Sequence, residues 1–467
     1  LGDVYKRQIV TWALGHLVTL ADPEEYDKKF KAWDMSYLPM VPKKWELVVI
    51  KQTSKQYHNV KTQLFRKDVS EIIIATDAGR EGELVARWIL DKSGCHKPIR
   101  RLWISSVTDK AIKEGFAHLK DGRSYNDLYH AARSRAEADW LVGINATRAL
   151  TCKYNAQLSC GRVQTPTLAM IAHREQQIRS FKPEDYYGLR CTTSVTGGSV
   201  GTMASIVTWT WQQKKSGSLR SFNKDLITVL DKKLKNQTLT VTDVHTSSKR
   251  TPSPGLYDLT ELQRDANKRF GFSAKETLNI MQSLYEHHKV LTYPRTDSRY
   301  LTTDVAETLR ERVEAIAVGP YRSFTNTVLK GKITPKKSFV NNQKVSDHHA
   351  IIPTEQPVIL AQLSVDERKI FDLVVRRFLA VLYPPYEYEQ TKITLECEGE
   401  TFFAEGNVPL NRGYKEVTAP DGDESGKVFP ALKEGEVIRD FSLKKTEGKT
   451  KPPARFTEGT LLKAMEN

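Results

Sequence analysis

The pattern of apolar and polar positions predicts an α/β domain at the start of the chain. Two short apolar runs rich in β-branched residues, Glu46–Ile50 and Glu71–Thr76, are typical of buried strands. The second run leads through a polar turn directly into a helical pattern, which indicates the strand–helix alternation of a parallel sheet. From about residue 111 to residue 179 the apolar spacing is mostly helical, so helices are expected to follow this domain.

The pattern then changes from strands to helices and back again. Residues 186–244 alternate β-branched or aromatic residues with polar ones, which predicts strands. A polar, proline-containing stretch, Ser247–Gly255, predicts a linker. Helical periodicity follows, and a second β-rich region, Tyr388–Gly406, comes after it. Strand-rich sequence on both sides of a helical block indicates one β domain that is interrupted by an insertion.

The helical block carries a clear start signal. Ser273 and Glu276 have the spacing of a capping box, in which each side chain binds the backbone amide of the other residue. The apolar spacing predicts which residues of this block face its core. They are Leu256, Leu259, Leu262, Ala266, Phe270, Leu278, Met281, Leu284 and Tyr285.

Composition adds a preference for an anionic partner. The 467 residues suffice for about three domains of roughly 150 residues each. Lys and Arg number 71 against 56 Asp and Glu, giving a formal charge of +15, which favours nucleic acid but equally allows a basic surface without such a partner. There is no run of about 18 apolar residues, so no membrane span is expected. The cysteines are odd in number and lack a Cys-x-x-Cys pair, which fits a reducing cytoplasm.

An acidic motif follows the second apolar run. In ATDAGREGE, Asp77 and Glu81 lie on either side of Gly79. Residues two apart in an extended turn point the same way, so the two carboxylates can converge on one cation. Mg²⁺ prefers such oxygens and usually takes one or two protein carboxylates. The alternative is that these acids only favour the positive N-terminus of the following helix.

A second motif, KVLTYPRTDSRYL, places Tyr293 between an apolar run and Arg295. A phenol ionises near pH 10, so a nucleophilic tyrosine needs cations and proton acceptors nearby. Arg295 can bind a phosphate through two parallel hydrogen bonds. His348 and His349 can donate to a phosphate, although paired histidines also occur as structural residues. The two histidines do not have the His-apolar-His form that binds the metal in rolling-circle nickases, which speaks against that class of enzyme. The alternative for Tyr293 and Arg295 is an ordinary strand tyrosine beside a surface arginine.

Two further stretches suit a nucleic-acid backbone. Trp140 and Arg148 are eight residues apart and lie on about the same face of a helix, where a tryptophan can stack a base and an arginine can bind a phosphate. A core tryptophan is the alternative. Ahead of the next helix is a polar turn whose free amides and arginine suit phosphates. The turn consists of Ser159, Cys160, Gly161, Arg162, Val163 and Gln164.

Together these motifs resemble the type IA DNA topoisomerases and, among them, the bacterial topoisomerase III group. Eight segments occur in the order of that family: VTWALGHLVTLADP, ATDAGREGELVARWI, EADWLVGINATRAL, GRVQTPT, GLYDLTELQRDANKRFG, LTYPRTDSRYL, DHHAIIPTE and ARFTEGTLLKAMEN. The resemblance implies a multidomain toroid with a Toprim α/β domain, helical domains and an interrupted β-rich gate domain. The implied domains are Toprim at 9–115, helical DNA-binding at 116–183, gate at 184–248 and 373–450, the tyrosine domain at 249–372, and a returning helical segment at 451–467.

The resemblance also implies roles for the candidate residues. Tyr293 would form a 5′-phosphotyrosine link to DNA, Arg295 would stabilise the phosphate, and His348 would assist. Asp77 and Glu81 would bind Mg²⁺. The implied contacts to single-stranded DNA are Trp33, Trp140, Arg148, Arg295 and the turn Ser159–Gln164. The implied activity is ATP-independent and Mg²⁺-dependent cleavage of one strand, strand passage and religation, which relaxes negative supercoils and decatenates DNA.

The sequence leaves other functions open and departs from the family at two places. A Toprim nuclease or primase, and a single-strand binder with impaired catalysis, are the alternatives. The family has Asp at the position of Gly79, and it opens with an apolar strand and a Glu-Lys-Pro motif that LGDVYKRQ does not resemble. The chain is therefore expected to bind single strands and to cleave them poorly. We expect a monomer in the bacterial cytoplasm, associated with the nucleoid or a plasmid.

Overall fold

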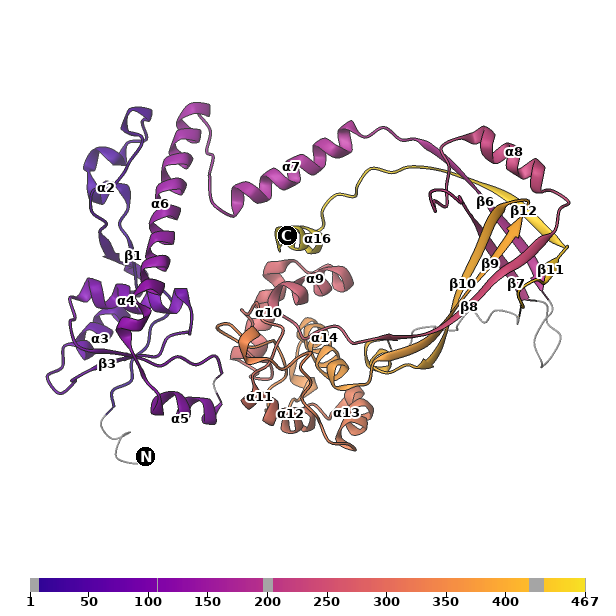
Figure 1. Cartoon of the computed structure of the whole chain (residues 1–467). Helices are drawn as coiled ribbons and strands as arrows, with labels where there is room; N and C mark the ends of the chain where they lie inside the picture. Colours follow the sequence, from indigo (N-terminus) through magenta and orange to yellow (C-terminus); the bar gives the residue numbers. More distant parts are fainter. Residues whose placement is uncertain (1–7, 107, 196–204, 420–431, 467) are drawn as a thin grey trace.

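The chain is arranged as a ring. The computed structural model describes residues 8–106, 108–195, 205–419 and 432–466; the opening residues LGDVYKR lie outside these ranges. Figure 1 shows an α/β part and a long helix on one side, a large curved sheet on the opposite side, and a compact helical part between them. Helix α7 (Gln164–Ser180) completes the ring along its upper edge and buries none of its side chains.

Within the residues that the structure describes, the α/β part contains two small sheets instead of one parallel sheet. Its strands are β1 (Val18–Leu20), β2 (Leu47–Val49), β3 (Ile72–Ile74), β4 (Ile99–Arg101) and β5 (Lys120–Asp121). β3 and β4 are parallel, which fits the predicted strand–helix alternation although the sequence analysis named no strand at β4, and β5 pairs antiparallel with β4. The prediction was wrong for β2, because that strand forms an antiparallel pair with β1, to which the sequence assigned no strand.

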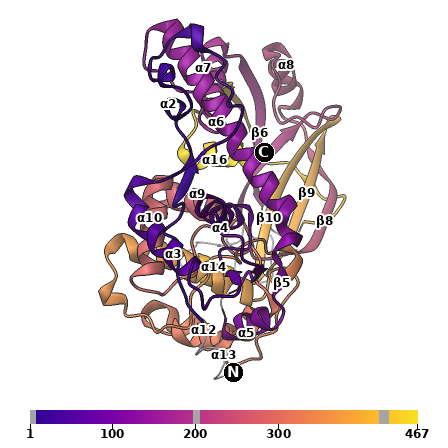
Figure 2. The same cartoon turned by 90° about the vertical axis from the view of Figure 1, so that its left-hand side faces the viewer.

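Four helices pack around these strands. They are α3 (Ser54–Leu64), α4 (Arg80–Ser93), α5 (Asp109–Ala117) and α6 (Asn126–Tyr154). The core between α4 and α6 contains Leu84, Trp88, Tyr129 and Ala132, all less than a tenth exposed. Figure 2 shows α6 rising away from α3 and α4, so the upper half of α6 projects beyond the α/β part. A short helix, α2 (Pro23–Tyr26), lies beside that half of α6 in both views.

Among the described residues, a seven-stranded antiparallel sheet forms the far side of the ring. The strands are β6 (Asp185–Val195), β7 (Ser205–Gln212), β8 (Leu239–Thr251), β9 (Tyr386–Cys397), β10 (Glu400–Asn411), β11 (Val437–Ile438) and β12 (Phe441–Lys449). Their order across the sheet is β11-β8-β9-β10-β7-β6-β12. Because β8 pairs directly with β9, strands from before and after the helical part share one sheet. The predicted interrupted β domain is therefore confirmed.

Two local features of the sheet differ from the sequence prediction. Helix α8 (Lys224–Leu234) was not predicted, although Ile227, Leu230 and Leu234 recur at helical spacing and are buried against the sheet. The predicted linker at Ser247–Gly255 is wrong over its first half. There β8 continues to Thr251, because each of its last residues pairs with β9.

The helical part is built around its last helix. It comprises α9 (Leu259–Phe270), α10 (Ala274–Glu286), α11 (Thr303–Glu307), α12 (Leu309–Ala315), α13 (Arg322–Leu329) and α14 (Val365–Leu382). α14 contributes nine buried residues to one apolar core, and the expected boundary between residues 372 and 373 falls inside this helix. After the sheet, α15 (Lys415–Thr418) and α16 (Glu458–Glu466) complete the fold, with α16 packed on α9. In the described residues no helix is both long and apolar enough to cross a membrane.

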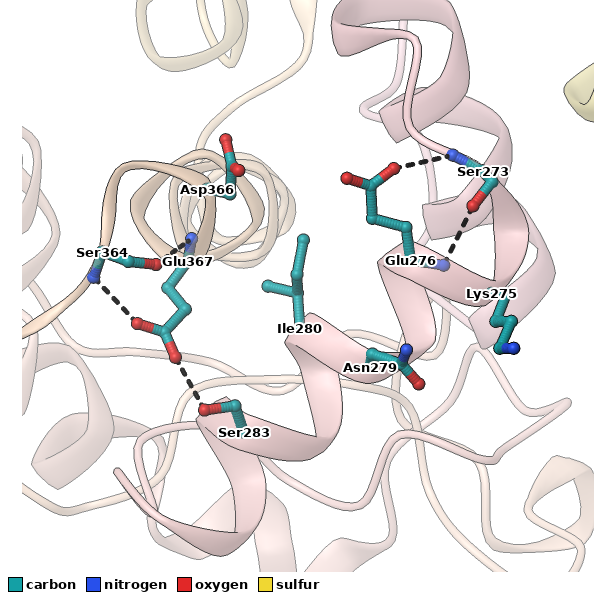
Figure 3. Close-up of a pocket in the computed structure, with 9 residues that line it drawn as sticks. All are labelled: Ser273, Lys275, Glu276, Asn279, Ile280, Ser283, Ser364, Asp366 and Glu367. Atoms are coloured by element: carbon teal, nitrogen blue, oxygen red, sulfur yellow. Dashed lines mark hydrogen bonds between the residues drawn. The ribbon is translucent and has the colours of Figure 1, made fainter.

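Two capping boxes begin the helices that line a surface hollow. The predicted Ser273–Glu276 box is present at α10, and Ser364 and Glu367 form a second one at α14. Figure 3 shows both boxes facing a hollow of about 460 Å³. Four of its polar side chains, those of the two boxes, are engaged in capping, and the hollow lies away from the residues with candidate chemistry.

Candidate active site

Tyr293 lies in an extended segment between α10 and α11, held beside residues 350–353. The Thr292 amide donates to the Ile352 carbonyl at 3.0 Å, and Leu291 forms an isolated bridge with Pro353. The half-buried Tyr293 ring packs against the His348 ring at 4.3 Å between centroids. These backbone contacts fix the tyrosine and the histidine next to each other.

Tyr285 is a neighbour that the sequence analysis assigned to the core. It lies on α10 with 38% of its surface exposed, and its ring meets the Tyr293 ring edge-on at 5.5 Å between centroids. Its position close to the end of α10, where the chain leaves the helical core, explains the difference. The Tyr293 ring is thus in contact with Tyr285 as well as with His348.

A buried arginine fixes the loop that carries Asp77. Arg101 is fully buried, forms an ion pair with buried Glu83 at 2.9 Å, and donates to the backbone carbonyls of Ile74, Thr76 and Asp77. An unpaired charge at this depth would be costly, so the pair and the carbonyls hold each other in place. The Asp77 side chain itself is 61% exposed and projects from this fixed loop.

Asp77, His348 and Tyr293 meet at the contact between the α/β part and the helical part. His348 Nε2 lies 3.7 Å from Asp77 Oδ2 while its ring contacts Tyr293. The contact with His348 lowers the pKa of Asp77. Burial and then the charge of Asp77 raise the pKa of Tyr293, whereas exposed Arg295 acts in the opposite direction. The phenol is therefore protonated at neutral pH.

Glu81 is not part of this group. Its carboxylate lies 3.5 Å from His16 Nε2 and 3.5 Å from Arg135 Nη1, with two thirds of the side chain exposed. Across the described ranges, no three His, Cys, Asp or Glu side chains are grouped so that they could hold a metal ion. The exposed Asp77 carboxylate still fits Mg²⁺, which commonly takes one or two protein carboxylates and completes its shell with water and phosphate oxygens.

Asp347 is a further acidic residue at this contact, and the sequence analysis missed it. A Cβ atom built on Gly79 would lie 2.0 Å from Asp347 Oδ2, so this carboxylate occupies the space of a side chain at position 79. Burial, and then the charges of Asp297 and Asp77, raise the pKa of Asp347, against the effect of His348. Its position next to His348 in SDHHA was the only sequence signal, and its contact with Gly79 exists only in the folded chain.

Trp140 is engaged in packing. Its indole Nε1 donates to the Ala21 carbonyl at 3.0 Å, and its ring meets Trp45 and Tyr26 edge-on. The side chain is partly buried. This environment favours the core alternative for Trp140 over a free surface on which a base could stack.

Arg148 and Trp33 form one unit beside Trp140. The Arg148 guanidinium donates to the Phe30 carbonyl and lies 5.1 Å from the centre of the Trp33 ring. Arg148 is only 6% exposed, whereas Trp33 is 51% exposed. Arg148 therefore supports the segment that presents Trp33 and has little surface of its own for a phosphate.

The turn between α6 and α7 is largely exposed. Thr147 Oγ1 accepts from the Cys160 amide and donates to its carbonyl, and the Gly161 amide donates to Thr165. Arg162 is exposed and forms an ion pair with Asp139 at 2.7 Å. Ser159, Val163 and Gln164 are also exposed. The amides of Cys160 and Gly161 are thus already bonded, which leaves Arg162 as the clearest group of the turn for a phosphate.

A polar latch joins the α/β part to the helical part at a second place. We call it the Asp304 latch; it consists of Ser106, Thr108, Lys110, Asp304 and Glu307. Asp304 accepts from Ser106 at 2.7 Å and from Thr108 at 2.8 Å, while Lys110 forms an ion pair with Glu307 at 2.8 Å. Figures 1 and 2 both show α5, the helix that carries Lys110, at the same end of the molecule as α12.

Two family models cover most of the chain. The model described as DNA topoisomerase matches residues 123–467, and the model described as Toprim domain matches residues 4–107. The chain therefore belongs to the DNA topoisomerase family of type IA, and the predicted family is confirmed. A curated DNA topoisomerase 3 from Bacillus licheniformis is 57% identical over 466 residues, and one from Bacillus subtilis is 57% identical over 472 residues.

These relatives are longer than this chain. The alignments cover 99% and 100% of this chain, which spans 63% of the length of each relative. The solved structure of full-length topoisomerase I from Thermotoga maritima aligns with a TM-score of 0.69 at 24% identity, covering 97% of this chain and 70% of that one. The likeness shows the fold, and it confirms the predicted multidomain architecture.

Proposed function

We propose that the chain carries the cleavage and religation centre of a type IA DNA topoisomerase, which cuts one DNA strand, lets another pass and reseals the first without ATP. One observation carries the proposal. Tyr293 and His348 from the helical part meet Asp77 from the Toprim part, where the two sides of the ring touch. A nucleophile beside a proton donor and an exposed carboxylate is what phosphoryl transfer to tyrosine needs.

The proposed step is a transesterification. Tyr293 Oη attacks the phosphorus, the bond from phosphorus to the 3′ oxygen breaks, and the phenol loses its proton while the leaving 3′ oxygen gains one. Atoms and charges balance, and one phosphate ester replaces another, so religation by the reverse step needs no ATP. His348, held against Asp77, is placed to donate to a phosphate oxygen, and Arg295 offsets charge on the same group.

Asp77 is the residue of this chain that would hold Mg²⁺ beside the phosphate. Glu81, the second carboxylate predicted from the sequence, is engaged by His16 and Arg135 in this structure. Bound Mg²⁺ would offset negative charge on the phosphate during the transfer. Asp77 keeps its position through the Arg101 contacts with the backbone of its loop, which do not depend on the ion.

Strand passage requires the two sides of the ring to separate. The Asp304 latch and the pair of His348 with Asp77 join these sides through hydrogen bonds and ion pairs, and the apolar cores of the two parts are separate clusters. Polar contacts of this kind contribute at most a few kcal/mol each and can be replaced by contacts with water. This supports a gate that opens while both cores stay intact.

Single-stranded DNA is the proposed substrate at the cleavage site. The net charge of +15 favours a polyanion, and exposed Arg162 and Trp33 offer a phosphate contact and a stacking surface near α6. Relaxation of negative supercoils and decatenation are the proposed outcomes. We further propose that the protein acts as a monomer in the bacterial cytoplasm.

Covalent trapping tests the proposed function. The chain is incubated with a labelled single-stranded oligonucleotide and Mg²⁺, denatured, and separated on a gel. A shifted labelled band is expected, and Tyr293→Phe should abolish it without changing oligonucleotide affinity. Tyr285→Phe is the matched control, because it removes a neighbouring hydroxyl and should leave the adduct in place. Cut DNA without any adduct would favour a Toprim nuclease and contradict the proposal.

A further inference from the structure

Threonine hydroxyls link the segment that carries Tyr293 to the segment that carries His348. Within these two stretches, residues 289–296 and 348–354, such hydroxyls donate to backbone carbonyls across the gap. The bonds run from Thr354 to Lys289 at 2.6 Å, from Thr292 to Ala350 at 3.3 Å and from Thr296 to His348 at 2.9 Å. The bond of Thr296 therefore ends directly on a residue of the candidate active site.

Thr296 is itself held firmly by backbone groups. Its side chain is 8% exposed, and its hydroxyl also accepts from the Ser298 amide at 3.1 Å. Its carbonyl accepts from the amide of Leu259, the first residue of α9, at 3.0 Å. Its amide donates to the Pro294 carbonyl at 3.2 Å, which closes a three-residue turn around Arg295. The direction of the Thr296 hydroxyl is thus fixed relative to the turn that presents Arg295.

The contacts of the His348 ring are too loose to place it by themselves. Its Nε2 lies 3.7 Å from Asp77 Oδ2, which is longer than an ordinary hydrogen bond of about 2.7–3.2 Å. Its other contact is ring packing on Tyr293, at 4.3 Å between centroids. The backbone from which the ring projects must therefore be held, because a misplacement of about 1 Å can slow a reaction roughly a hundredfold.

We propose that Thr296 is a positioning residue for strand cleavage, because its hydroxyl holds the His348 backbone where the imidazole meets Tyr293 and the phosphate bound by Arg295. This inference rests on the proposed function and adds a residue that acts through His348. If the hydroxyl served only to stabilise the fold, its loss would act on stability and would not depend on the histidine.

Single-turnover adduct formation at saturating oligonucleotide tests the effect on rate. Thr296→Val keeps the branched shape and removes the hydroxyl, so it should slow the reaction about ten- to a hundredfold. Oligonucleotide affinity should stay within about twofold of the parent, since no DNA contact is lost. Thr296→Ser retains the hydroxyl and should restore the rate to within about threefold of the parent.

Thr354→Val is the matched control. The Thr354 hydroxyl also donates across the same two segments and also accepts from the amide two residues further on, that of Gln356 at 3.3 Å. Its bond ends on Lys289, away from His348. Thr354→Val should therefore leave the adduct rate within about threefold of the parent. Equal slowing by the two valine variants would overturn the inference.

A double variant shows whether Thr296 acts through the histidine. In the His348→Gln background, Thr296→Val should slow adduct formation by less than about threefold, because the ring that it positions is already absent. A role confined to the fold would give the same factor in both backgrounds. That result, or failure of Thr296→Ser to restore the rate, would contradict the inference.

A measurement without DNA separates this inference from the proposed function. Fluorotyrosine is incorporated at position 293 of the whole chain, and fluorine NMR reports the rings that contact it. Thr296→Val should move the resonance towards the position that His348→Gln gives, while Thr296→Ser and Thr354→Val should leave it in place. An unmoved resonance in Thr296→Val would overturn the inference even if the parent forms the adduct. A parent without any adduct would contradict the proposed function, and the resonance would still decide whether Thr296 places His348.

Discussion

His348 Nε2 and Asp77 Oδ2 lie 3.7 Å apart although one residue belongs to the helical part and the other to the Toprim part. The contact exists only while the ring is closed at this point. His348 also packs on Tyr293, so the histidine connects the proposed nucleophile with the acidic loop. The active centre that we propose therefore forms where the Toprim part and the helical part touch, and neither part contains it alone.

Substitutions of this pair should not be additive. We expect Asp77→Asn to slow adduct formation at least about tenfold and His348→Gln about a hundredfold, the range typical of groups that assist proton transfer or support a metal. The double variant should lie within about threefold of the slower single variant, because each change already breaks the same contact. Single-turnover adduct formation measures all three. A rate equal to the product of the two effects would show that the residues act independently.

The Asp304 latch should set how often the ring opens. Asp304→Ala removes the acceptor for Ser106 and Thr108, and hydrogen bonds to charged groups contribute about 1.5–3 kcal/mol each. With both bonds lost, the closed ring should lose up to roughly 3–6 kcal/mol of stability, which small-angle X-ray scattering would detect as a larger radius of gyration. Asp366→Ala is the control, since Asp366 pairs with Lys369 on its own helix. An unchanged radius would mean that the latch does not hold the ring closed.

Glu367 should make stability depend on acid pH. Burial alone would raise the pKa of its carboxyl, but hydrogen bonds from Ser283 and Ser364 outweigh that effect and lower it to about 2 from 4.5. A lowered pKa contributes stability above pH 4.5 that is lost as the pH falls towards 2. After solvent screening, the shift should contribute no more than about 1–2 kcal/mol at neutral pH.

Urea unfolding of the parent and of Glu367→Gln at pH 7 and near pH 2.5 would check this. The difference in unfolding free energy should be large at pH 7 and should shrink strongly at the lower pH. Asp366→Asn, whose side chain is 48% exposed, is the control and should show little difference at either pH. A Glu367→Gln effect that stays constant with pH would assign the stabilisation to packing instead of the ionised carboxylate.

Arg162 and Arg148 should affect DNA binding in different ways. Exposed Arg162 is expected to reach a phosphate, so Arg162→Ala should weaken single-strand binding and reduce the log–log salt slope by about 0.7. Buried Arg148 holds the Phe30 carbonyl and the Trp33 ring, so Arg148→Ala should lower the unfolding temperature instead. Fluorescence anisotropy at several salt concentrations and thermal unfolding separate the two effects. A reduced slope for Arg148→Ala at an unchanged unfolding temperature would contradict this assignment.

Local signals in the sequence predicted the local elements well. The Ser273–Glu276 capping box is present because both partners lie within one turn. The last residues of β8 were read as a linker because their strand character comes from pairing with β9, more than a hundred residues later. β2 likewise has a partner, β1, that its own periodicity does not reveal. Helix α8 is different, since its buried Ile227, Leu230 and Leu234 were visible at helical spacing.

In the candidate site, too, local motifs revealed some residues, whereas others depend on partners that are distant in the sequence. Tyr293, His348 and Asp77 were selected from motif chemistry, and the structure brings these three together. Asp347 could not be selected, because its meaning depends on the space at Gly79 on another domain. Trp140 and Arg148 were expected to offer one helix face to DNA. Instead, both side chains donate to backbone carbonyls of the segment between β1 and β2, so both take part in packing.

The most direct test of the central claim is the identity of the residue that carries DNA after cleavage. Trapped adduct is digested with nuclease and trypsin and examined by mass spectrometry, which needs only a low yield. Lys289 and Arg295 bound the peptide VLTYPR, in which Tyr293 is the only hydroxyl apart from Thr292. We predict a 5′-phosphate-linked nucleotide on Tyr293 in this peptide. A nucleotide on any other residue, or one linked through a 3′ phosphate, would contradict it.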